Sequence, residues 1–226
     1  MPRLARVVVP GCPHHITHRG NRRDIVFFEE DDREEYLAIL LDYTRQYGVD
    51  IWGYCLMSNH VHLLGVPEHE DSLGLAIGRA HMKYARHANR RQRWWGHLWA
   101  NRFYSTPLDE GHCWNALKYI ECNPLRAHLV QLPWEYPWSS AHAHVLGNPH
   151  PVLKPCTLDS IFPPGVPWGA WLSEMEDEVA LTQLRANTYT GWPTGSPEFI
   201  AKLEAQLGRR LTRQQAGRKS KQEGNK

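Results

Sequence analysis

The chain has 226 residues, enough to bury one hydrophobic core, so we expect one main domain with appended segments. Its 26 Lys+Arg against 24 Asp+Glu leave a formal net charge of only +2, which by itself points to no nucleic-acid partner. Five cysteines without a C-x-x-C pair argue against a disulfide framework and a zinc knuckle, so we expect reduced thiols in a cytoplasmic protein. Because no apolar run approaches ~20 residues, we expect neither a signal peptide nor a membrane span.

The first half of the chain alternates strand and helix signals. Residues 14–19 alternate their side chains and end at a Gly-Asn turn, which predicts a strand. Residues 31–48 begin with acids and end with glycine, as a capped amphipathic helix does. Two strand-like runs, 49–57 and 60–67, flank Ser58-Asn59, which predicts a tight hairpin.

Three further elements complete the predicted core. Residues 71–92 repeat apolar side chains at helical spacing, residues 99–108 resemble a strand, and residues 111–130 resemble a helix interrupted at Asn123-Pro124. The first six elements follow the order of an α+β ferredoxin-like split βαβ sandwich, an antiparallel sheet with helices on one face. The last helix is an addition to that fold.

The composition changes after the predicted core, which we place at residues 1–147. Residues 148–189 are proline-rich and then acidic, with a short helix predicted in 173–187, and we interpret them as a wrapping extension. Residues 190–226 hold eight Lys/Arg and three Glu, a net +5, and predict one helix, 196–208, before a polar tail. We expect this last segment to contact DNA, with Arg209 and Arg210 among its contacts.

His60 and His62 lie two residues apart in a predicted strand, so both imidazoles should project from one face of the sheet. Two neutral imidazoles in this arrangement can hold one divalent cation and leave the rest of its coordination open. The alternative is that they are ordinary interior or edge histidines, since H-x-H patterns are common.

Tyr119 lies on the additional helix, and Asn123 follows one turn later, so both could face a metal ion on the sheet. A tyrosine hydroxyl needs only modest electrostatic help to attack phosphorus. Two structural alternatives stay open: Tyr119 is a packing residue, and Asn123 is a helix N-cap followed by Pro124.

Residues 72–108 contain no Asp or Glu, but they hold seven Lys/Arg interleaved with tryptophan, phenylalanine and tyrosine. Such a segment can pair phosphates with cations and stack exposed bases on its rings, although a solvated helix face and a core are the alternatives. The residues that we expect to bind DNA here are Arg79, Lys83, Arg86, Arg90, Arg93 and Arg102.

Three blocks together, "HHITHRGNRR", "GYCLMSNHVHLL" and "LKYIECNPLRA", resemble the signature motifs of the single-tyrosine HUH transposases. The later "GSPEFIAKLEAQLGRRL" and "GRKSK" resemble the REP-associated tyrosine transposase branch. The resemblance covers about residues 7–130 and the tail. It departs from the usual pattern at "TGWPTGS", where an arginine-rich turn is common, and at Glu121 and Cys122.

The resemblance implies a ferredoxin-like core and a divalent metal, usually Mg²⁺ with Mn²⁺ as a substitute. It makes Tyr119 the nucleophile, His60 and His62 the metal pair, and Asn123 a further metal ligand. It also implies a substrate of single-stranded DNA beside hairpins of REP-like palindromes, cut and rejoined through a 5′-phosphotyrosine. No membrane and no nucleotide cofactor are expected.

Two other functions stay open at this point. One is a non-catalytic module of ferredoxin-like fold that binds single-stranded nucleic acid, which would need exposed rings on its sheet. The other is a structural zinc protein that uses the histidine pair and cysteines. The sequence leaves the oligomeric state and the hairpin sequence undetermined.

Overall fold

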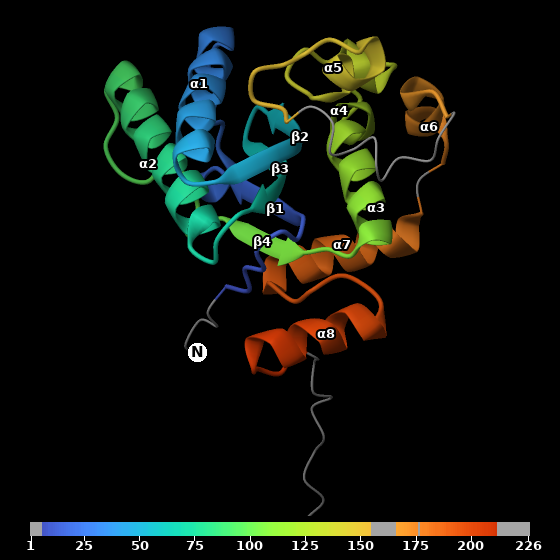
Figure 1. The fold of residues 1–226 in the computed structure, drawn as a ribbon. Helices are drawn as coiled ribbons and strands as arrows, with labels where there is room; N and C mark the ends of the chain where they lie inside the picture. The colour runs from blue at the N-terminus through green and yellow to red at the C-terminus, as the bar shows by residue number, and fades with distance from the viewer. Residues whose placement is uncertain (1–5, 155–165, 176, 212–226) are drawn as a thin grey trace, which may run out of the picture.

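The structure is a computed structural model that describes residues 6–154, 166–175 and 177–211 (Figure 1). Its strands are β1 (His14–Arg19), β2 (Val49–Met57), β3 (His60–Pro67) and β4 (Tyr104–Pro107). Its α-helices are α1 (Glu30–Gln46), α2 (Ser72–Gln92), α3 (Glu110–Glu121), α4 (Asn123–Arg126), α5 (Ala141–Leu146), α6 (Trp168–Ser173), α7 (Glu178–Thr190) and α8 (Pro197–Leu207). Two 3₁₀ turns, η1 (Asn21–Arg23) and η2 (Pro133–Glu135), complete the described elements. Within these ranges, no helix has both the length and the apolar character that a membrane span requires.

The four strands form one antiparallel sheet in the order β2-β3-β1-β4. Strand β1 therefore lies in the middle, paired with β3 on one side and β4 on the other. This order, with α1 between β1 and β2 and α2 between β3 and β4, confirms the predicted ferredoxin-like split βαβ sandwich.

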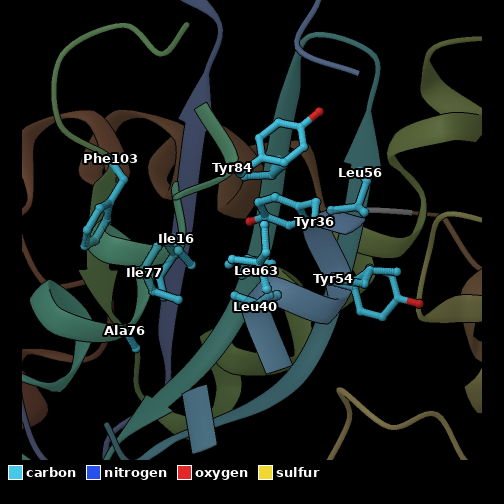
Figure 2. Close-up of a cluster of buried hydrophobic side chains, with 14 of the residues drawn as sticks. Ile16, Tyr36, Leu40, Tyr54, Leu56, Leu63, Ala76, Ile77, Tyr84 and Phe103 are labelled. Atoms are coloured by element: carbon cyan, nitrogen blue, oxygen red, sulfur yellow. The ribbon is translucent and has the colours of Figure 1, made fainter. Parts of the chain in front are cut away.

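One face of the sheet is covered by α1 and α2, which lie together on that side in Figure 1. The alternation along β1 and β3 sends Ile16 and Leu63 into this layer, where they meet Leu40 of α1 and Ile77 of α2. Figure 2 shows this cluster of buried side chains. It is the larger of the apolar clusters and fixes which face each strand residue occupies.

The opposite face of the sheet is covered by α3, the helix that the ferredoxin-like order does not require (Figure 1). Asp109 caps its N-terminus by accepting a hydrogen bond from the backbone N–H of His112 (2.9 Å). Gly53 of β2 allows the close approach, since a Cβ there would lie 2.4 Å from Leu117 Cδ1. The Leu117 side chain of α3 therefore packs directly on the backbone of β2.

The segment after α4 packs around α3. Glu121, fully buried at the end of α3, accepts hydrogen bonds from Ser140, from His144 of α5 and from the Trp168 indole of α6. Helix α7 lies along the same face of the sheet and contacts α3, β4 and β1. Helix α8 packs its Leu203 against Val7 and Val9.

Most predicted elements are observed within a residue or two of their expected ends. The interrupted helix expected over 111–130 is shorter, because α4 ends at Arg126. The predicted strand 99–108 is wrong in its first half, because Trp99 forms only an isolated bridge with Gly20 and the strand begins at Tyr104. The short acidic helix expected in 173–187 begins later, at Glu178, and continues to Thr190. The tail beyond residue 211 lies outside the described residues.

Buried histidines are unusually frequent in this fold. Three of them, His14, His15 and His18, belong to β1, and they are joined by His62 of β3 and His81 of α2. On the α1/α2 side, His18 Nδ1 lies 2.7 Å from His81 Nδ1, whose Nε2 meets the Tyr36 hydroxyl at 2.9 Å. Burial lowers the pKa of His14 and His18 to about 4 and that of His15 to about 3, so all three are neutral near pH 7.

These histidines should make the protein acid-sensitive. In the unfolded chain their pKa returns to about 6.5, so the unfolded state binds protons that the folded state does not. The free energy of unfolding should fall as the pH drops below 6.5 and continue falling until about pH 4. Each of His14, His15 and His18 should contribute about 2 kcal/mol of this loss between pH 7 and pH 5.

Urea unfolding at pH 7.5, 6 and 5 measures this loss directly. A His69→Gln variant is the matched control, because His69 is 68% exposed and its replacement should leave the pH dependence unchanged. An unfolding free energy that stays level between pH 7 and pH 5 would contradict the buried neutral histidines.

Candidate active site

The two histidines of the H-x-H pattern lie at the start of β3, on the sheet face covered by α3. His62 is buried and His60 is half-buried. Their ring centroids are 4.9 Å apart and the ring planes cross at 84°. The predicted placement of both imidazoles on one face is therefore confirmed.

Both imidazoles are uncharged near neutral pH. Burial, with a smaller effect from the charge of Arg19, lowers the pKa of His60 to about 4. Burial also holds the pKa of His62 well below its usual range, assisted by His60 and His15. Neutral imidazole is the form that binds metal ions, so the pair is suited to that role without prior loss of protons.

The hydrogen bond of His60 identifies which of its nitrogens has the lone pair. His60 Nδ1 lies 2.6 Å from Asn59 Oδ1, while Asn59 Nδ2 donates to the backbone carbonyl of Arg23 (3.1 Å). Because an amide oxygen only accepts, His60 must donate from Nδ1. The Nε2 lone pair of His60 is then available to a cation.

Tyr119 of α3 lies edge-on to the histidines. Its ring centroid is 5.3 Å from that of His62 and 5.7 Å from that of His15, at interplanar angles of 85° and 87°. The guanidinium groups of Arg126 and Arg185 lie over the Tyr119 ring, 4.3 and 5.2 Å from its centroid. Arg126 also donates to the backbone carbonyl of Tyr119. The half-buried tyrosine is thus held between two imidazoles and two cations.

His15 of β1 joins the site from the neighbouring strand. Its Nε2 lies 2.9 Å from His62 Nδ1, and its Nδ1 lies 2.8 Å from the hydroxyl of Thr188 on α7. All three side chains are buried. From the sequence, His15 is predicted only to lie in a strand, and neither His15 nor Thr188 is predicted to belong to the site.

Asn123 is the first residue of α4, one turn beyond Tyr119. The N-cap of α4 is Cys122 and not Asn123, so the capping alternative is wrong. Its amide Nδ2 is buried and has no hydrogen-bond partner among the residues that the structure describes. Rotating the Asn123 amide group by 180° exchanges the positions of its nitrogen and oxygen. An oxygen without a hydrogen-bond partner would then occupy the same buried position.

The donor set fits a mixed nitrogen and oxygen site. In the described ranges, no three His, Cys, Asp or Glu side chains are grouped so that they could hold a metal ion, which gives no support to a structural zinc site there. His60 and His62 would supply two nitrogens, and Asn123 is a candidate for one oxygen. The remaining positions would need oxygens from a substrate or water, as in weak Mg²⁺ or Mn²⁺ sites.

Four of the expected DNA-binding residues, Arg79, Lys83, Arg86 and Arg90, are exposed along α2. Arg79 lies over the ring of Tyr47, which directly follows α1, and Lys83 lies over the Tyr43 ring of α1. Since α1 and α2 cover the sheet face opposite α3, this basic stripe is separated from Tyr119 by the thickness of the sheet (Figure 1).

A second basic surface brings together residues far apart in sequence. A cavity of about 510 Å³ is lined by Arg102, which follows α2, by Arg209 and Arg210, which follow α8, and by Arg6 near the N-terminus. No Asp or Glu lies among the described residues that line it. Thr188 also lines this cavity, so it lies beside the candidate active site.

The aromatic residues of segment 72–108 divide into two groups. Trp99 and Phe103 are buried in the core, so their predicted availability for stacking is wrong. Trp95 is 97% exposed and Trp94 is 53% exposed, directly after Arg93 at the end of α2. The exposed pair can stack on a ligand without unfolding, and the half-buried Tyr104 lines the basic cavity.

Comparisons with known proteins identify the family and the fold of the chain. A family model described as "Transposase IS200 like" matches residues 8–123, just over half of the chain. A curated Haemophilus influenzae protein named as a REP-associated tyrosine transposase is 26% identical over 128 residues, which cover 52% of this chain and 73% of that protein. The solved structure of a REP-associated tyrosine transposase bound to a REP hairpin superposes with a TM-score of 0.53 at 17% identity, covering 69% of this chain and 93% of that one. The resemblance drawn from the motifs is therefore confirmed.

Proposed function

Because this chain belongs to the IS200-like transposase family, we propose that it cuts and rejoins single-stranded DNA beside palindromic hairpins through a covalent bond to Tyr119. The proposal is supported above all by one contact: the Tyr119 ring lies edge-on to His62, a member of the histidine pair that can hold a metal ion. A nucleophile beside a Lewis-acid site is the arrangement that phosphoryl transfer requires. The hairpin substrate is inferred from the solved relative, which holds a REP hairpin.

The proposed reaction is a transesterification. The Tyr119 hydroxyl oxygen attacks the scissile phosphorus, the bond from phosphorus to the 3′ oxygen breaks, and the tyrosine proton ends on the departing 3′ hydroxyl. The products are a 5′-phosphotyrosine and a free 3′ end. Since the phosphodiester count is unchanged, attack by another 3′ hydroxyl reverses the step and joins strands without ATP.

The residues around Tyr119 have separate tasks in this reaction. His60, His62 and Asn123 would hold the divalent cation, Mg²⁺ or Mn²⁺, which supplies Lewis-acid polarisation of the phosphate when bound. Arg126 and Arg185, whose guanidinium groups lie over the Tyr119 ring, are placed to pair with the negative charge of the phosphate. Their contacts also restrict the ring to one orientation for in-line attack.

We assign two surfaces to the DNA. The cavity lined by Arg102, Arg209 and Arg210 lies beside the active site, so it suits the single strand near the cut. The stripe on α2 lies across the sheet and suits a more distant part of the substrate, such as the hairpin stem. Arg93 stands beside the exposed Trp94 and Trp95, where an unpaired base could stack.

The alternative of a non-catalytic single-strand-binding sheet is less compatible with the geometry. That mode requires aromatic rings exposed on the sheet, as in RNA-binding domains. Here α1 and α2 cover one face, and α3 with α7 covers the other. A sheet covered on both faces has no platform for bases.

Replacing Tyr119 with phenylalanine tests the nucleophile. The variant keeps the ring contacts to His15 and His62 but loses the attacking oxygen, so hairpin binding should persist while cleavage falls by more than ~10³-fold. A denaturing gel of labelled hairpin DNA with Mg²⁺ measures the covalent adduct. Tyr136→Phe, which loses only a hydroxyl bonded to the Leu56 carbonyl, is the matched control and should still form adduct. If Tyr119→Phe cleaves at a normal rate, another group is the nucleophile.

Replacing His62 with alanine tests the metal pair. Cleavage should be lost at millimolar Mg²⁺, while hairpin affinity should stay within a few fold because most phosphate contacts lie elsewhere. In a His60→Ala variant, Mn²⁺ should restore part of the activity, since it accepts nitrogen ligands more readily than Mg²⁺. Tight stoichiometric zinc with chelator-insensitive cleavage would show instead that the histidines are structural.

Salt dependence tests the two basic surfaces separately. Each lost contact with single-stranded phosphate should reduce the slope of log affinity against log salt by about 0.7. We expect a reduced slope for the alanine variant of Arg102, Arg209 and Arg210, measured with a single-stranded flank, and for the variant of the α2 stripe, measured with a hairpin. Lys154→Ala, whose ammonium already pairs with Asp50, is the control. An unchanged slope would identify that surface as merely solvated.

A further inference from the structure

Thr188 and His15 form a hydrogen-bonded chain that ends on His62. The chain runs from the Leu184 backbone carbonyl to the Thr188 hydroxyl (2.7 Å), on to His15 Nδ1 (2.8 Å), and from His15 Nε2 to His62 Nδ1 (2.9 Å). It joins α7, β1 and β3, and its three side chains are buried. The Thr188 hydroxyl and each neutral imidazole have one proton to donate. The direction of the hydrogen bond between Thr188 and Leu184 therefore decides the direction of the two that follow.

The proton of Thr188 must lie toward Leu184. A carbonyl oxygen only accepts, and two oxygens 2.7 Å apart with no proton between them would repel each other. The Thr188 hydroxyl therefore donates to the Leu184 carbonyl and has only its lone pairs to offer His15. His15 must then donate from Nδ1.

The tautomer of His15 in turn determines which nitrogen of His62 is protonated. The surroundings of His15 are Thr188, His62 and the Tyr119 ring, with no carboxylate among these contacts to favour a charged imidazole. A neutral His15 that donates from Nδ1 has a bare Nε2, which can only accept. His62 must therefore donate from Nδ1.

The ring geometry supports a true hydrogen bond between the two imidazoles. The His15 and His62 planes differ by only 7°, and their centroids are 5.1 Å apart. The nitrogens are 2.9 Å apart, closer than two stacked ring faces approach, so the rings lie edge to edge in nearly one plane. This is the arrangement in which an N–H points along the partner's lone pair.

We propose that Thr188 and His15 are positioning residues that fix His62 in the Nδ1–H tautomer and thereby leave its Nε2 lone pair to the metal ion. The inference rests on the proposed metal role of His62. His60 and His62 would then both be Nδ1–H tautomers, because Asn59 holds His60 in that form. It also makes α7, which lies beyond the matched residues 8–123, part of the active site.

The consequence of losing the Thr188 hydroxyl follows from the chain. In a Thr188→Val variant, His15 Nδ1 has no partner in either tautomer, so the preference for Nδ1–H disappears. When His15 takes the Nε2–H form it donates to His62, which must then place its own proton on Nε2. That form of His62 cannot bind a cation through Nε2.

The test begins with metal-free protein labelled with ¹⁵N-histidine, whose long-range ¹H–¹⁵N spectra report the tautomer of each imidazole. We expect Nδ1–H for His62 and His15 in the wild type, mixed tautomers in Thr188→Val, and the wild-type pattern in Thr188→Ser, which restores the hydroxyl. Thr44→Val removes a buried helical threonine hydroxyl on α1 and should change nothing at His62. Wild-type His62 found as Nε2–H would overturn the proposal.

Metal affinity supplies the second readout. Titration with Mn²⁺ alone, followed by electron paramagnetic resonance, should give about tenfold weaker binding for Thr188→Val than for the wild type or Thr188→Ser. Equal affinity and equal tautomers in Thr188→Val and wild type would also overturn the proposal. Neither readout involves DNA cleavage, so failure of Tyr119 as the nucleophile would leave this result intact.

Discussion

The antiparallel register of β1 and β3 is the constraint on which the active site depends. Thr17 pairs with His62 and His15 with Leu64, so His15 and His62 are diagonal neighbours on one face. A slip of one residue in either strand would turn the imidazole of that strand toward α1 and α2. Ile16 and Leu63, buried on that other face, prevent the slip because it would expel them from the core. The apolar packing of one face thus fixes the polar geometry of the other.

A second constraint sets the height of α3 above the sheet. Gly53 has no side chain where Leu117 Cδ1 comes down onto β2, and any larger residue there would push against the helix. Tyr119 follows Leu117 by two residues, so its distance from the histidine rings depends on this contact. The buried Glu121, bonded to three partners from the following segments, holds the end of the same helix. Tyr119 is therefore positioned by packing on both sides of its own helical turn.

Some of these features can be predicted from the sequence and others cannot. Period-two alternation locates β1, β2 and β3 and places the histidine pair on one face, because those signals are local. The predicted role of Tyr119 comes from the resemblance, because its spacing alone favours a packing residue. Nothing local marks Arg185 or Thr188, since their contacts arise only when α7 docks on the sheet. Composition likewise cannot separate buried Trp99 from exposed Trp95, because exposure depends on how the loop after α2 folds back onto β1.

The position of α7 in the chain also bears on how the enzyme is made. Synthesis runs from the N-terminus, so the sheet, the histidine pair and the tyrosine leave the ribosome before α7 does. A nascent chain, or a product ended by an early stop codon, therefore has Tyr119 and His15 without the contacts that Arg185 and Thr188 make to them. The candidate site is therefore complete only after α7 has been made and has docked on the sheet.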